Sequence, residues 1–144
     1  MNNLNKKDYN KYDYWCWENF FNKSEIKKFN KEINKNIDSK ENPENAASNS
    51  KEQGLKNVDT LVVKLSNIDK LRYDLKFTVL INLSEKKYTG GDFKLFNHEI
   101  YTVDKFKNSG SVLMFKPYIN HCVTPITSGE RKTFTIFAYG PKWR

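Results

Sequence analysis

The sequence is poor in the residue types that build most metal sites and disulfide frameworks. Its 144 residues include only two cysteines, two histidines and four prolines. Cys16 and Cys122 form no C-x-x-C pair, so we expect two free thiols in a reducing compartment. No apolar signal segment opens the chain, and no apolar run approaches the ~18 residues that cross a bilayer. These absences predict a cytoplasmic protein that has no membrane partner.

Arginine is also scarce, although the chain is strongly basic. Lysine and arginine together number 25 against 17 acidic residues, a net charge of +8 that suggests nucleic-acid binding. Only three of the basic residues are arginine, the residue type that reads base edges by paired hydrogen bonds. The excess is also diffuse: residues 1–58 carry 11 basic and 9 acidic residues, whereas residues 59–144 carry 14 and 8. Composition therefore argues against a nucleic-acid partner.

The N-terminal part combines an aromatic segment, a helix and a polar stretch. The aromatic segment, YWCWENFF at 14–21, is typical of a strand or anchor packed on a core. Ile26, Phe29 and Ile33 then lie on one face of a helix from Ser24 to about Asn36, with Ser24 as the expected N-cap. Residues 37–57 are rich in Ser, Asn, Glu and Lys and predict a long loop.

Strand patterns dominate the rest of the chain. A β-branched run, TLVVKL, occupies residues 60–65, and LKFTVLINL from residue 75 alternates with one strongly apolar face. A Gly90–Gly91 turn follows, and further strands are expected at 111–115, 121–126 and 131–140. Four aromatic residues in this part are expected to pack in the core or at its rim: Tyr88, Phe93, Phe96 and Phe115. The pattern predicts a mainly β domain, a sandwich or barrel, behind an N-terminal helix.

Two polar residues mark a candidate site near the C-terminus. His121 falls near the start of a strand, and Arg131 begins the strand that returns after a turn at Ser128–Gly129. Arg131, Thr133 and Thr135 share one face of that strand, and a guanidinium beside hydroxyls suits a carboxylate. A histidine on the neighbouring strand would let the site hold a metal and an anionic cosubstrate together.

An ordered set of motifs adds a family resemblance over about half the chain, from residue 75 to residue 144. A strand ending in Asn-Leu, a Y-x-G-G turn, a G-S-V-L-x-F strand and H-x-V-T-P-I-x-S-G-x-R follow one another. This set resembles the C-terminal half of prolyl-4-hydroxylase-like Fe(II)/2-oxoglutarate dioxygenases, above all the small versions found in bacteria and their phages. The start of the chain, YWCWENFFNKSEIKKFNKEI, is similar to the helix that precedes the core in such proteins.

The resemblance implies a double-stranded β-helix, or jelly roll, whose mouth holds Fe(II). His121 matches the distal iron ligand, and Arg131 matches the residue that binds the far carboxylate of 2-oxoglutarate, with Thr133 as a hydroxyl helper. It also implies ascorbate as a reductant, a peptide, protein or small-molecule substrate, and the cytoplasm of a bacterium or infected host cell. Two imidazoles and one carboxylate are the ligand set that suits Fe(II) in such oxygenases.

The chain departs from the family pattern at the H-x-D motif, which supplies the other two ligands. The nearest match is Asn67-Ile68-Asp69, with Asp74 as a weaker carboxylate candidate, while His98 lies in an expected loop where the family places no ligand. Either the chain is a compact variant with an N-x-D site, or it has lost the middle segment and its metal site. The first explanation predicts a dioxygenase; the second predicts an inactive remnant that serves as a binding domain. In both, residues 1–58 form a helical and loop extension to a jelly-roll core at 59–144.

Overall fold

The computed structural model describes residues 14–36, 73–97 and 99–142. These residues form nine β-strands, one α-helix and one 3-10 helix, which confirms a mainly β fold with a helix near its start. The strands are β1 Tyr14–Trp17, β2 Tyr73–Asn82, β3 Thr89–Gly90, β4 Phe93–Asn97, β5 Glu99–Thr102, β6 Val112–Phe115, β7 Asn120–Val123, β8 Ile126–Ser128 and β9 Thr133–Pro141. The α-helix is α2 Lys23–Asn36, and the 3-10 helix is η1 Asp104–Lys107.

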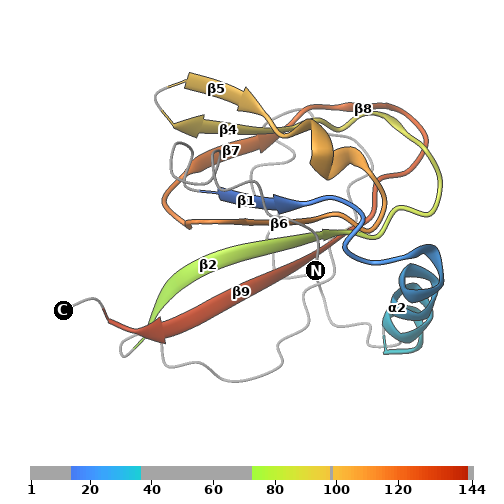
Figure 1. Ribbon diagram of the computed structural model, residues 1–144, viewed down its shortest axis with the longest axis horizontal. Coiled ribbons are helices and arrows are strands. Elements are labelled where there is room, and N and C mark those ends of the chain that lie inside the picture. Colours follow the sequence, from blue (N-terminus) through green and yellow to red (C-terminus); the bar gives the residue numbers. More distant parts are fainter. Residues whose placement is uncertain (1–13, 37–72, 98, 143–144) are drawn as a thin grey trace.

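The strands form two antiparallel sheets that lie one above the other, with a short third ladder beside them. The larger sheet has the order β1-β6-β2-β9, the second has the order β5-β4-β7, and β3 pairs with β8. Figure 1 shows the β5-β4-β7 sheet above the larger one, with α2 at the end of β2. This arrangement is compatible with a β-sandwich.

Strand β2 separates two hydrophobic clusters, because both of its faces are covered. The sequence predicted one strongly apolar face, which carries Ile81, and the structure buries the opposite face as well. On the opposite face Thr78, Leu80 and Asn82 are 5%, 7% and 0% exposed. Leu80 packs in the cluster between the two sheets, whereas Ile81 packs in the cluster under α2. Period-two alternation shows which residues share a face, but not how many layers cover the strand.

Helix α2 begins one residue earlier than predicted and is capped by Asn22, not by Ser24. The Asn22 side-chain oxygen accepts hydrogen bonds from the backbone N–H groups of Ser24 and Glu25, at 2.9 and 3.1 Å. The Glu25 carboxylate in turn accepts the Asn22 backbone N–H at 2.8 Å. This reciprocal pair is a capping box, which an Asn-x-x-Glu spacing also predicts.

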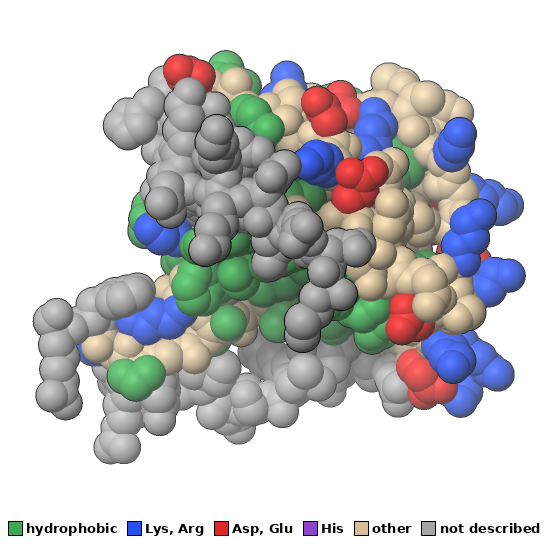
Figure 2. Space-filling view, in the orientation of Figure 1, with side chains coloured by type: hydrophobic (Ala, Val, Ile, Leu, Met, Phe, Trp, Pro, Cys, Tyr) green, Lys and Arg blue, Asp and Glu red, His purple; other side chains and the backbone are tan. Residues whose placement is uncertain are grey.

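The apolar face of α2 holds the helix against the larger sheet. Ile26 is buried beside Ile81, and Ile33 packs against the same cluster, whereas Phe29 stays partly exposed. Asn30 donates from its amide to the Leu83 backbone oxygen at 3.1 Å. Lysine side chains, with acidic ones between them, cover the outer side of the helix (Figure 2).

Several predicted elements lie outside the described residues. These are the loop at 37–57, the strand at 60–65 and the domain boundary at 58/59. Both β1 and α2 precede that boundary; β1 belongs to the larger sheet, and α2 packs on it. The predicted strand at 121–126 is divided into β7 and β8, with Pro125 between them. None of the described helical segments has the length and apolar character needed to span a membrane.

Candidate functional site

The start of β9 places two polar side chains at the edge of the inter-sheet core. Thr133 is the first residue of β9 and lies opposite Asn82 of β2, on the face that carries Leu80. Arg131 precedes it by two residues. The Arg131 Nε and the Thr133 Oγ1 are both buried and have no hydrogen-bond partner within the described residues. Thr135, predicted to share this face, lies opposite Leu80 but is exposed. Arg131 and Thr133 therefore form a polar pair with unused hydrogen-bonding capacity.

The guanidinium of Arg131 lies between two aromatic side chains. Its Cζ is 5.8 Å from the centroid of the Phe106 ring, which belongs to η1. Tyr88 approaches from the segment before β3. Gly91 permits this close approach, since a Cβ there would lie 3.1 Å from both the Arg131 Cδ and the Tyr88 Cε2. A φ of +63° at Gly91 further favours glycine at this position.

Arg131 is a buried cation without a carboxylate partner in the described part of the chain. Burial lowers the pKa of Arg131, and attraction and hydrogen bonding from Tyr88 partly oppose that shift. A guanidinium nevertheless remains protonated in proteins. The acidic residue of the adjacent turn, Asp92, is already paired with Lys107 at 2.6 Å, which holds the pKa of that carboxyl below its usual range. No carboxylate of the described residues is therefore paired with Arg131.

His121 lies on the second sheet and is oriented by its own backbone. It occupies β7 opposite Leu95, a buried residue of β4. Its Nδ1 lies 2.9 Å from the Ile119 backbone oxygen. Because a carbonyl oxygen can only accept, Nδ1 carries the proton in the neutral ring and Nε2 keeps a free lone pair. The imidazole therefore has Nε2 available as an acceptor, an arrangement also found in many metal-binding histidines.

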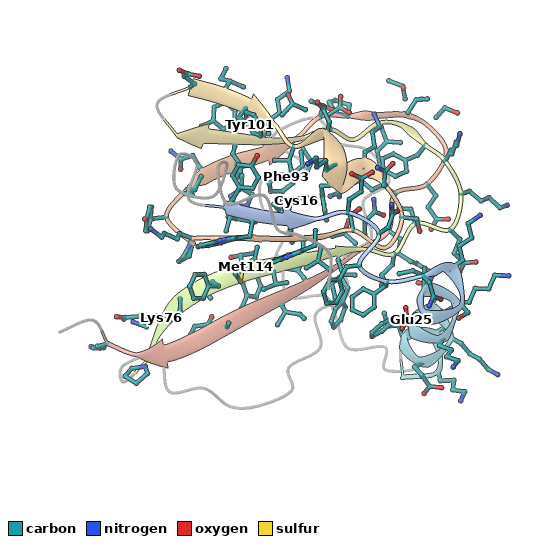
Figure 3. The ribbon with its side chains drawn as sticks, in the orientation of Figure 1. Cys16, Glu25, Lys76, Phe93, Tyr101 and Met114 are labelled. Carbon is teal, nitrogen blue, oxygen red and sulfur yellow. The ribbon has the colours of Figure 1, made fainter. Side chains whose placement is uncertain are left out.

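A series of aromatic rings connects His121 with Arg131. The imidazole stacks on Phe93, with ring centroids 5.6 Å apart, and meets the edge of Phe115 at 4.8 Å. Phe93 in turn lies 5.8 Å from Phe106, the ring beside Arg131. Figure 3 shows Phe93 in the space between the two sheets. His121 and Arg131 therefore flank one shared apolar core.

The remaining predicted metal ligands are not brought to His121 by the described residues. Asn67, Asp69 and His98 lie outside the described ranges. Asp74 lies near the start of β2 opposite Gly140, with its carboxylate 3.8 Å from the Lys76 ammonium group. Within residues 14–36, 73–97 and 99–142, no three His, Cys, Asp or Glu side chains come together to hold a metal. His121 is thus a single prepared ligand there.

No protein-family model matches this chain, and a search of curated proteins finds no match either. The site is therefore interpreted from its own side chains.

Two residues of the site were not predicted to have a polar role. Tyr88 was expected only to pack, and it is indeed 8% exposed, but its hydroxyl faces Arg131 and Asn82. Asn82 was assigned to the polar face of a strand, yet it is fully buried. The available signal was an Asn at the end of an apolar strand, followed by a Tyr just before two glycines. That spacing alone does not show that the three side chains meet.

Proposed function

We propose that the protein is an Fe(II)/2-oxoglutarate-dependent dioxygenase with a double-stranded β-helix core, acting on a peptide, protein or small molecule. The observation that carries the proposal is the half-buried Arg131 side chain, whose buried Nε has no hydrogen-bond partner and which has no carboxylate partner among the described residues. An imidazole with a free Nε2 lies on the other side of the same aromatic core. The motif resemblance supports the same assignment.

In this proposal Arg131 and Thr133 bind the distal carboxylate of 2-oxoglutarate. A guanidinium can donate two parallel hydrogen bonds to one carboxylate, and the Thr133 hydroxyl can add a third. Binding would give the buried Arg131 charge the anionic partner that it otherwise lacks. A buried cation gains more from such a partner than an exposed one, because less water screens the interaction.

His121 would ligate the metal through Nε2, with Asp69 and Asn67 as the remaining ligands suggested by the resemblance. Ferrous iron, when bound, supplies oxygen activation coupled to oxidative decarboxylation of the 2-oxo acid. The overall reaction balances: one oxygen atom of O2 enters succinate, the other enters the hydroxylated product, and CO2 leaves. The side chains of this protein hold the cosubstrate at one end and direct Nε2 toward the site at the other.

A second candidate function is a non-catalytic binding domain that keeps the carboxylate site. It is favoured by the observation that the described residues bring no three metal-ligating side chains together. Such a domain would bind a carboxylate at Arg131 without turning it over. The two candidates therefore share the anion site and differ in the metal site.

Succinate formation from 2-oxoglutarate with Fe(II), ascorbate and oxygen distinguishes the two candidates. We expect turnover by the unaltered protein and its loss in Arg131→Ala and in His121→Ala. Lys132→Ala is the matched control, since it removes a cation from the adjacent residue. Carboxylate binding without succinate, and without stoichiometric Fe(II) binding, would refute the enzyme and leave the binding domain.

A further inference from the structure

Tyr88 has a hydroxyl whose two polar neighbours are both hydrogen-bond donors. The side-chain amide nitrogen of Asn82 lies 3.2 Å from the Tyr88 hydroxyl. The Arg131 side chain is the other polar neighbour of Tyr88, since its Cδ and the Tyr88 Cε2 would both lie 3.1 Å from a Cβ at Gly91. Neither group can accept a hydrogen bond from the phenol, since an amide NH2 and a guanidinium only donate hydrogen bonds. The phenol proton is therefore left without an acceptor among the described residues.

The orientation of the Asn82 amide is fixed by three further contacts. Its amide nitrogen donates to the backbone oxygens of Phe106 and Lys107, at 2.9 and 3.1 Å. Its amide oxygen accepts the Ser84 backbone N–H at 3.0 Å. A rotated amide would direct its oxygen toward two carbonyl oxygens, so the nitrogen must face Tyr88. Asn82 thereby makes the Tyr88 oxygen an acceptor on that side and leaves its proton to point elsewhere.

The hydrogen bonds of Asn82 also position Phe106, the second aromatic residue beside Arg131. Through Phe106 and Lys107, Asn82 holds the η1 segment that places the Phe106 ring beside the guanidinium. The Asn82 backbone is also fixed, because its N–H donates to Ser111 and its oxygen accepts from Gly110. One fully buried side chain therefore contacts both Tyr88 and the η1 segment that carries Phe106.

We propose that Tyr88 is a second carboxylate-binding residue, whose phenol donates a hydrogen bond to the carboxylate held by Arg131. Asn82 is its positioning residue and acts only through the orientation of the phenol and of η1. The inference rests on the carboxylate site of the proposed function and does not depend on iron. It assigns the Arg131 site to a planar anion that can accept from a guanidinium and from a phenol at once.

The test measures binding of 2-oxoglutarate by calorimetry in the absence of metal, at fixed pH and salt. Tyr88→Phe removes only the hydroxyl and keeps the ring that packs beside Gly91. A hydrogen bond to a charged group in a buried site corresponds to at least a ~10-fold change in Kd. We therefore expect Tyr88→Phe to raise Kd by ~10-fold or more. Tyr118→Phe, at a tyrosine that is 69% exposed, should leave Kd unchanged.

Asn82→Ala tests the positioning role in a double-mutant cycle with Tyr88→Phe. We expect Asn82→Ala to raise Kd in the unaltered background and to have a much smaller effect once the Tyr88 hydroxyl is gone. A purely structural role would give the same fold-change in both backgrounds and would overturn the assignment of Asn82. The Tyr88→Phe measurement stands even if Asn82→Ala does not fold.

The outcomes separate this inference from the proposed function. If Arg131→Ala abolishes binding while Tyr88→Phe leaves Kd unchanged, the role of Tyr88 is refuted and the carboxylate site remains. If the unaltered protein does not bind 2-oxoglutarate, both proposals fail together. Loss of affinity in Tyr88→Phe without any succinate formation would support the inference and the binding-domain function.

Discussion

The buried Nε of Arg131 has no hydrogen-bond partner among the described residues. We therefore predict that Arg131 lowers the free energy of unfolding of the ligand-free protein. Arg131→Met keeps an unbranched chain that can pack against Phe106 and Tyr88, but it removes the guanidinium. A buried donor without an acceptor, such as the Arg131 Nε, destabilises a fold by about 1–3 kcal/mol, and the variant regains this. It loses the contact with the Phe106 ring, which contributes ~1 kcal/mol at a partly buried site.

The balance leaves Arg131→Met between equal to the unaltered protein in stability and more stable by ~2 kcal/mol. In a chain of this length each kcal/mol of that gain raises Tm by about 3–4 °C. The order should reverse when 2-oxoglutarate is added. A ligand at ~100 times its Kd stabilises the native state by ~2.7 kcal/mol, and only the unaltered protein should gain this.

Urea unfolding followed by circular dichroism, with and without 2-oxoglutarate, measures both effects. Lys132→Met is the control for adding an apolar side chain next to the site. A ligand-free Arg131→Met less stable than the unaltered protein by ~2 kcal/mol or more would show that the guanidinium stabilises the fold, and the reasoning would be wrong. Equal stabilisation of both proteins by the ligand would place the carboxylate elsewhere.

Three further predictions concern the metal site, the helix cap and a buried thiol. If Asn67 occupies the position of the missing histidine, Asn67→His should tighten Fe(II) binding in a titration, and no change would indicate that the site is absent. Asn22→Ala should lower the free energy of unfolding in urea by ~1 kcal/mol because it removes the helix cap, whereas Ser24→Ala should change it by only a few tenths. Burial raises the pKa of Cys16 from 9.0 to about 11, which favours the neutral thiol in the folded state. This contribution to stability is complete below pH 9 and is lost as pH rises from 9 toward 11, so Cys16→Ala should flatten the pH dependence of unfolding in that interval.

Local pattern was enough to predict most elements of the described fold. Alternation predicted β2, the aromatic segment predicted β1, and apolar spacing predicted α2 to within a residue at its start. The burial of the second face of β2 could not be predicted, because it depends on β4, a distant strand that lies above it. The helix cap differs: the Asn-x-x-Glu spacing of Asn22 and Glu25 indicates it locally, although Ser24 was the predicted cap.

The candidate site was predictable in its residue types but not in its surroundings. Arg131, Thr133 and His121 could be selected because each carries the chemistry of anion or metal binding. Tyr88, Asn82 and Phe106 could not, since they come from three separate segments and meet only in the folded chain. Asn82 lies 6 and 24 residues from the two groups that it orients, a separation that no periodic pattern encodes.

The proposed site has a carboxylate half and a metal half, which come from different parts of the molecule. Substitutions can therefore affect carboxylate binding and metal binding separately. The carboxylate half depends on the β3 turn, η1 and the start of β9, all of which contact one another through Asn82 and Tyr88. The metal half takes His121 from β7, and the resemblance takes its other ligands from residues before β2. A chain could therefore lose metal binding and keep the carboxylate half intact. Under the proposed function, binding of 2-oxoglutarate should therefore survive His121→Ala, whereas turnover, which needs both sets of residues, should not.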